Sequence, residues 1–146
     1  MKIHIATDHA GFELKCKIFN YLIDEGHNVI DHGALSFDPK DDYPDYVLPC
    51  AKEVSKDSNS LGIILGGSGQ GEAIAANRIK GVRAIVYYGF EKKIPILSRE
   101  HNNANILSIG ARFVSEQEIF ETINKWMNES FAGGRHQRRI DKLDSI

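Results

Sequence analysis

The chain has 146 residues, of which 42% are hydrophobic and 26% are charged, and its formal net charge is −2. This length allows one domain to bury a core without disulfides or a structural metal, and the charge gives a nucleic-acid partner no support at the level of the whole chain. No apolar run approaches the roughly 20 residues of a membrane span, and the N-terminus lacks the apolar segment of a signal peptide, so we expect a cytoplasmic protein with no membrane contact.

Strand and helix patterns alternate along the chain. Runs rich in β-formers predict strands over Lys2–Thr7, Asn28–Asp31, a segment centred on Ile63–Leu65, Val82–Tyr87 and Asn105–Ile109. Helical spacing predicts a helix with the apolar residues Phe12, Cys16, Phe19 and Ile23, and further helices over Pro44–Lys56, from Ala73, over Glu91–Arg99 and after Ser115. The alternation predicts a three-layer α/β fold with a five-stranded parallel sheet.

The two cysteines, Cys16 and Cys50, fall inside helical patterns and far from any CxxC spacing. No pair of histidines has the spacing of metal ligands either. We therefore expect two buried or half-buried free thiols, and neither a disulfide nor a metal site.

A glycine-rich loop in Leu61–Asn77, LGIILGGSGQGEAIAAN, joins an apolar strand to a helix. Glycine removes the Cβ atoms that would keep a ligand away from the backbone, so consecutive N–H groups can point at one anion. The glycines stand at positions 66, 67, 69 and 71, and the polar side chains are Ser68, Gln70 and Glu72. The pattern predicts an anion-binding loop, with a plain structural turn as the alternative.

Two other phosphate-binding motifs fit this loop poorly. Its spacing is GxGxG rather than the GxGxxG of dinucleotide-binding proteins, and Tyr87 and Tyr88 stand where an acidic residue would contact the ribose. A P-loop is excluded because GK[ST] is absent.

Glu72 has two interpretations. A carboxylate in the first turn of a helix can simply complement the helix dipole. Beside free N–H groups it can also serve as the base that removes a proton α to a carbonyl. That role needs a raised pKa, so desolvation by bound substrate must outweigh the helix N-terminus, which lowers the pKa, and the sequence leaves the outcome open.

Further polar residues follow the strands. Asp8 and His9 follow the first strand and Arg112 the fifth, so they should share the edge of the sheet where the glycine loop lies. Helix capping and a plain surface charge are the alternatives for these residues. His101, in REHNNAN, is either structural or catalytic.

A basic tail follows Gly133-Gly134, which divides the chain into a domain over residues 1–132 and a tail over residues 133–146. If the tail is helical, Arg135 and Arg139 share a face, with His136 beside them. The tail is either a solvated basic run or a phosphate-binding element that reaches a neighbouring subunit.

Several motifs occur in one order over nearly the whole chain: IATDHAGFELK, DYPDY, GGSGQGEAIAANR, SREHNNAN, IGAR and GRHQRRID. In this order they resemble the ribose-5-phosphate isomerase type B family, which also contains the galactose-6-phosphate isomerase subunits. The resemblance implies a flavodoxin-like, Rossmann-like fold and an intertwined homodimer with shared active sites and a C-terminal tail exchanged across the dimer. Whether the dimers pair further into tetramers is left open. It also implies no metal and no cofactor.

The resemblance assigns roles by position. Asp8 and His9 would contact the sugar and its phosphate, and Tyr43 would line the pocket. His101 would open the furanose ring, with Asn102 next to it. The backbone from Gly67 through Gly69 and Gly71 to Glu72 would stabilise the enediolate, and phosphate would be held by Arg112, Arg135 and Arg139, with His136 close by.

One position departs from much of the family. Many members carry a cysteine base directly before the glycine loop, whereas this chain has Gly66. It resembles the branch with GGSGxGE, in which the loop glutamate is the base. Glu72 would then transfer the proton and Ser68 would assist.

The expected function is the interconversion of ribose 5-phosphate and ribulose 5-phosphate through a cis-enediolate, in the pentose phosphate pathway. One alternative is the same chemistry on a six-carbon sugar phosphate, such as allose or galactose 6-phosphate. Another is a non-catalytic module that binds sugar phosphates.

Overall fold

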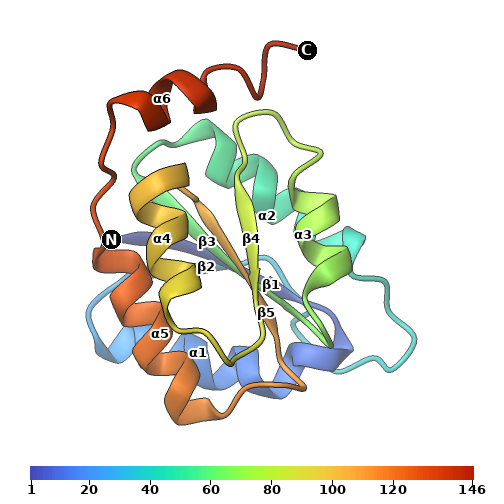
Figure 1. The fold of residues 1–146 in the computed structure, drawn as a ribbon. Helices are drawn as coiled ribbons and strands as arrows, with labels where there is room; N and C mark the ends of the chain where they lie inside the picture. The colour runs from blue at the N-terminus through green and yellow to red at the C-terminus, as the bar shows by residue number, and fades with distance from the viewer.

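The structure, a computed structural model that describes residues 1–146, contains one parallel sheet with the strand order β2-β1-β3-β5-β4 (Figure 1). The strands are β1 (Lys2–Thr7), β2 (Asn28–Asp31), β3 (Ser60–Gly66), β4 (Ala84–Tyr87) and β5 (Ile106–Gly110). The predicted three-layer α/β fold is confirmed. The strand order is that of flavodoxin, 2-1-3-4-5, with the last two strands exchanged.

The helices at Pro44 and after Ser115 begin where the sequence predicts, whereas the helix predicted from Ala73 begins at Gln70 and the one predicted from Glu91 begins at Lys93. The helices are η1 (His9–Gly11, a 3₁₀-helix), α1 (Phe12–Asp24), α2 (Pro44–Lys56), α3 (Gln70–Ala76), α4 (Lys93–Asn102), α5 (Glu116–Asn128) and α6 (Arg135–Ile140). Pro44 is the first residue of α2, where its missing N–H is not needed. The Ser115 hydroxyl accepts a hydrogen bond from the N–H of Glu118 at 3.3 Å and so caps α5.

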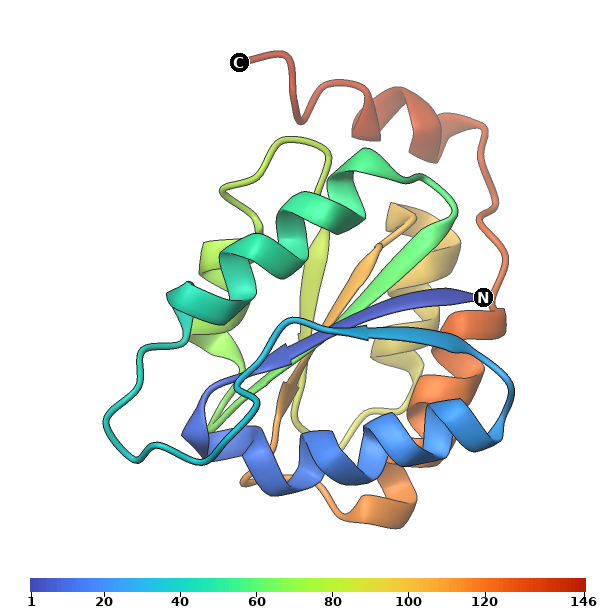
Figure 2. The same cartoon turned by 180° about the vertical axis from the view of Figure 1, so that it is seen from behind.

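Helices cover both faces of the sheet (Figure 2), and the core has two parts, one on each face. On one face, side chains of α1 and α5, including Trp126, pack against β1, β3 and β5. On the other, side chains of α2 and α3 pack against the sheet around Ile64. Successive residues of β3 alternate between the two faces, since Ile63 and Leu65 belong to the first part and Ile64 to the second.

The predicted apolar face of α1 is wrong. Its buried residues are Lys15, Ile18 and Leu22, whereas Cys16 and Ile23 are exposed. The apolar spacing predicts the wrong buried face because α1 buries a lysine. The Lys15 ammonium donates to both oxygens of Asp31 at 2.8 Å and to the carbonyl of Ala34 at 2.6 Å.

The two cysteines have different surroundings. Cys50 is buried in α2, and burial raises the pKa of its thiol. Cys16 is exposed, which corrects the expectation that both thiols are at least half-buried. None of the helices has the length and apolar character needed to cross a membrane.

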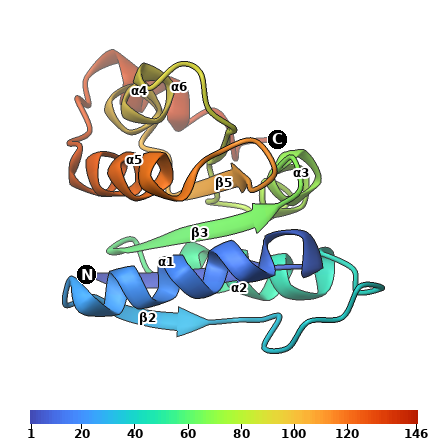
Figure 3. The same cartoon turned by 90° about the horizontal axis from the view of Figure 1, so that it is seen from below.

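The C-terminal tail folds back on its own chain, with α6 against α4 (Figures 1 and 3). The N–H of Ala132 donates to the carbonyl of Glu100 at 2.9 Å, and the carboxylate of Asp144 accepts from the N–H of Gly81 at 3.0 Å. Within one chain, the tail therefore lies beside α4.

Candidate active site

The glycine loop forms the bend from β3 into α3, and three of its glycines make room for side chains of the site. A Cβ atom at Gly71 would lie 2.7 Å from the phenol oxygen of Tyr43, and one at Gly67 would lie 2.9 Å from a guanidinium nitrogen of Arg112. A Cβ atom at Gly66 would overlap the carboxylate of Glu72. The glycines thus bring a phenol, a guanidinium and a carboxylate up to the backbone of the loop.

Glu72 is a buried carboxylate in the first turn of α3, and only 5% of its surface is exposed. Burial raises the pKa of Glu72, and the negative charge of Asp8 raises it further. A hydrogen bond from the backbone N–H of Glu72 to its own carboxylate lowers the pKa, but the net shift is upward. Burial within the protein alone therefore favours the protonated form of Glu72, and desolvation by bound substrate would act in the same direction. A carboxylate with a raised pKa is suited to take and return a proton near neutral pH.

The loop is held in place by Ser108, which the sequence analysis did not select. Its buried hydroxyl donates to the carbonyl of Gly69 at 2.6 Å. Gly69 has a φ of +80°, a backbone conformation that favours glycine. Ser68 is exposed, and its hydroxyl accepts from the N–H of Gln70 at 3.4 Å.

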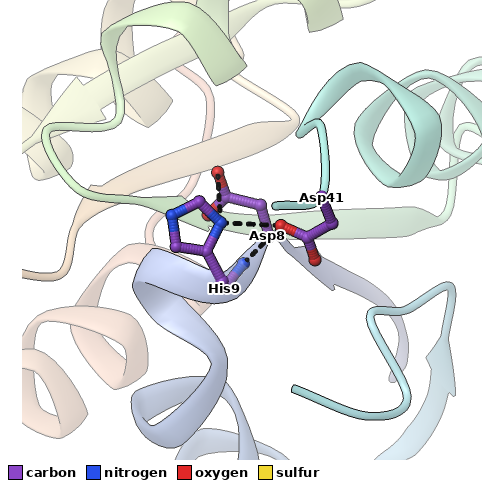
Figure 4. A group of neighbouring side chains, drawn as sticks. All are labelled: Asp8, His9 and Asp41. Carbon is purple, nitrogen blue, oxygen red and sulfur yellow. Dashed lines mark hydrogen bonds and ion pairs between the residues drawn. The ribbon is translucent and has the colours of Figure 1, made fainter. Parts of the chain in front are cut away.

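Asp8, His9 and Asp41 form a cluster after β1 (Figure 4). Asp8 is buried, and its carboxylate accepts from the N–H of Ala10 at 3.0 Å, so it caps η1 as the sequence analysis allowed. Ring nitrogen Nδ1 of His9 lies 2.7 Å from Oδ1 of Asp41. No local pattern in the sequence marks Asp41, because its partner lies 32 residues away along the chain.

The same cluster has the residue types of a metal site, and its possible ligand atoms lie within 4.8 Å of one another. The distance of 2.7 Å between His9 and Asp41 is that of a charge-assisted hydrogen bond. This bond engages the ring nitrogen Nδ1, which also lies 4.0 Å from Oδ2 of Asp8. We therefore describe the cluster as a hydrogen-bonded group.

The remaining predicted residues lie at the opposite edge of the sheet. His101 and Asn102 end α4, which leads into the amino end of β5, and α6 carries Arg135, His136 and Arg139. The rings of His101 and His136 stack with centroids 4.5 Å apart and planes inclined by 11°. Burial lowers the pKa of His136, and the neighbouring cations add to this effect.

The predicted site residues therefore form two groups in one chain, at opposite ends of the strands. Figure 1 shows α6 and the end of α4 at one end of the strands and the bend from β3 into α3 at the other. The loop group consists of Asp8, His9, Tyr43, Gly67, Gly69, Gly71, Glu72 and Arg112, and Ser68 lies on its exposed rim. The tail group consists of His101, Asn102, Arg135, His136 and Arg139. A single chain does not bring the two groups together.

Known proteins match this chain over nearly its whole length. The protein-family model for Ribose/Galactose Isomerase matches residues 3–143. The ribose-5-phosphate isomerase B of Mycolicibacterium paratuberculosis is 43% identical over 144 residues, which are 98% of this chain and 89% of that protein. The Escherichia coli enzyme of the same name is 37% identical over 145 residues, 99% of this chain and 95% of its own.

Solved structures agree with the fold. The ribose-5-phosphate isomerase B of Mycoplasma genitalium with bound ribulose 5-phosphate has a TM-score of 0.92 at 43% identity and covers 97% of this chain and 93% of its own. The Clostridium thermocellum ribose-5-phosphate isomerase B has a TM-score of 0.94 at 39% identity, and the match covers 100% of this chain and 97% of that protein's chain. The chain therefore belongs to the Ribose/Galactose Isomerase family.

Proposed function

We propose that this protein interconverts ribose 5-phosphate and ribulose 5-phosphate. The observation that carries the proposal is the buried carboxylate of Glu72, whose pKa is raised beside the glycine loop. Relatives named ribose-5-phosphate isomerase B at 37% to 43% identity support the choice of substrate.

In the proposed reaction, Glu72 removes the proton from C2 of the open-chain aldose and returns it to C1. The backbone N–H groups of the loop from Gly67 to Gly71 face the negative charge that develops on the enediolate oxygens, and Ser68 assists the proton transfer. Such a base contributes roughly 10²- to 10⁴-fold in rate, and stabilisation of the oxyanion adds a further large factor. These steps use only side chains and backbone of the protein, so the proposal includes no metal and no cofactor.

Substrate binding is assigned to both edges of the sheet. We assign the contacts with the sugar to Asp8 and Tyr43, and ring opening to His101 with Asn102 beside it. A phosphate group would be bound by Arg112, His9 and the basic residues of the tail group, Arg135, His136 and Arg139. Remote binding of the phosphate orients the reacting carbons, which is how binding energy raises the rate.

We propose a homodimer in which the loop group of one subunit meets the tail group of the other. Two observations support it. The loop group and the tail group are separated within one chain. In a twofold dimer, the loop group of each subunit can meet the tail group of its partner, so that two complete sites form. In addition, three exposed aromatic side chains flank the loop group after β4 and β5: Tyr88 lies with its ring centroid 6.3 Å from those of Phe90 and Phe113.

A panel of sugar phosphates tests the proposed function. Turnover of ribose 5-phosphate should exceed that of allose 6-phosphate and galactose 6-phosphate at equal concentration. Faster turnover of a six-carbon substrate would replace the proposed substrate and keep the chemistry. Binding of all these compounds without turnover would contradict an isomerase. We expect the enzyme in the cytoplasm, because a charged sugar phosphate does not cross a membrane unaided.

A further inference from the structure

Asp41 makes two hydrogen bonds to one histidine through one oxygen atom. Its Oδ1 accepts from the backbone N–H of His9 at 3.0 Å and lies 2.7 Å from the ring nitrogen Nδ1 (Figure 4). Only 4% of the Asp41 side chain is exposed. A buried carboxylate that meets a histidine at two points fixes the orientation of the ring.

This geometry also decides which ring nitrogen carries a proton. An ionised carboxylate can only accept, so Nδ1 of His9 must be the donor to Asp41. A neutral His9 ring would then have no proton on Nε2, and its lone pair would repel an anion. The second nitrogen lies on the side of the ring that faces away from Asp41 (Figure 4). Only the doubly protonated ring can donate from this nitrogen to a phosphate.

Two carboxylates beside His9 favour that cation, and the guanidinium of Arg112 opposes it. Asp8 lies beside it with Oδ2 4.0 Å from Nδ1, Asp41 faces it from the loop before α2, and Arg112 faces it from the end of β5. Glu13 and Lys17 of α1 line the same surface hollow and oppose each other in charge. With a neutral His9, the carboxylates of Asp8 and Asp41 would face the guanidinium of Arg112 alone.

We propose that Asp41 is a positioning residue that holds His9 as an imidazolium, with Nε2–H directed at the phosphate group of the substrate. This inference rests on the proposed function, because the sugar phosphate supplies the anion. Asp41 itself does not touch the substrate.

The electrostatics of the cluster agree with the geometry. The hydrogen bond to Asp41 raises the pKa of His9 above its ordinary value of 6.5, and the charges of Asp8 and Asp41 act in the same direction. Desolvation and Arg112 lower the pKa but do not cancel the increase. Phosphate binding should therefore weaken as the pH rises through this elevated pKa.

The test is the pH dependence of KM for ribose 5-phosphate in the wild type and in Asp41→Asn. At pH 8 we expect KM to be about five- to tenfold higher in the variant than in the wild type. A decrease of one unit in the pKa of His9 lowers the fraction of His9 that is protonated by up to tenfold at this pH. At pH 6 the two KM values should agree within about twofold, because both rings are then largely protonated. The value of kcat should change little at either pH. The titration of the substrate phosphate is common to both proteins and cancels in the comparison.

Asp42→Asn is the matched control, because it makes the same substitution at an exposed carboxylate one position later. It should follow the wild type at both pH values. An Asp41→Asn variant whose KM ratio is equal at pH 6 and pH 8, or whose kcat falls equally at both, would overturn the inference and leave a structural role.

An NMR titration of the His9 ring separates this inference from the proposed function. The resonance is assigned with His9→Gln, and inorganic phosphate serves as the probe. The wild type should show a His9 pKa above 6.5 that rises further with phosphate, whereas Asp41→Asn should show a lower His9 pKa. A wild-type His9 pKa at or below 6.5 overturns the inference even if the enzyme is active. If the wild type shows the expected His9 titration but does not turn over ribose 5-phosphate, only the proposed function is overturned.

Discussion

The carboxylate of Glu72 occupies the space in which a side chain of Gly66 would lie, and a Cβ atom at position 66 would overlap it. The last residue of β3 and the first turn of α3 are therefore coupled. Because Gly66 has no side chain, the carboxylate can be buried against the strand end. A cysteine side chain at position 66 and the observed Glu72 carboxylate would therefore compete for one space.

Gly66→Ala should reduce kcat by about 10²-fold or more, because it displaces the proposed base. The backbone of Gly66 is outside the left-handed region, so alanine fits its conformation and the loss would come from the overlap alone. Steady-state kinetics with ribose 5-phosphate provides the measurement. A variant with near wild-type kcat would show that Glu72 need not occupy this position.

Gly67→Ala provides the comparison at the next residue. Here the new Cβ atom would lie 2.9 Å from the end of the Arg112 side chain, which is exposed and can move. We expect a higher KM with a much smaller effect on kcat, because Arg112 is assigned to phosphate binding. Equal effects of the two alanine substitutions on kcat would indicate a general distortion of the loop.

Glu72→Gln should stabilise the protein at neutral pH. Burial raises the folded-state pKa of Glu72 above its ordinary 4.5, so folding favours the protonated form. Glutamine resembles the protonated form of glutamate, so below about pH 4.5 the wild type and the variant should be equally stable. The wild type then loses stability relative to the variant as the pH rises through the folded-state pKa of Glu72. Thermal unfolding should give a higher Tm for the variant at pH 8 and a smaller difference at pH 4. A lower Tm at pH 8 would contradict a desolvated carboxylate.

Mixing two inactive variants tests the shared site. In a mixed dimer of Arg139→Ala and Glu72→Gln chains, one site has both lesions and the other has neither. A random mixture should therefore regain about one quarter of the wild-type activity. If loop and tail of the same subunit form each site, every site carries one lesion and activity does not return. Each variant refolded alone is the control.

Lys15→Met should destabilise the fold by about 3–5 kcal/mol, because it leaves Asp31 without its buried partner. Lys17→Met is the matched control. Lys17 lies on the exposed face of α1, 3.1 Å from Glu116, and solvent screening leaves such surface pairs with little effect on stability. Urea unfolding measures both. Equal effects of the two substitutions would contradict the structural role of Lys15.

Local signals in the sequence were sufficient for most of the fold. The bounds of α2 follow from Pro44 and from the polar residues after Lys56, and the start of α5 follows from Ser115. The buried face of α1 could not be predicted in the same way. Lys15 is buried only because Asp31, on another element, neutralises it, and a search for apolar periodicity passes over such a residue.

The candidate site was predicted in part for a similar reason. Residues that directly follow a parallel strand share one edge of the sheet, and Asp8 and Arg112 do so. His101 ends a helix that returns to the opposite edge, so its nearness to β5 in sequence does not place it with Glu72. Asp41 lies in a loop without periodicity, and its contact with His9 exists only in the folded chain.

The most direct test of the account follows the hydrogen at C2. Ribose 5-phosphate deuterated at C2 is incubated with the wild type and with Glu72→Gln, and the products are analysed by NMR. The account predicts that the wild type forms ribulose 5-phosphate whose label has moved to C1 or been lost to water, and that Glu72→Gln does so at least about 10²-fold more slowly. A folded wild type that never removes the label, or a Glu72→Gln variant that removes it at the wild-type rate, would contradict the account.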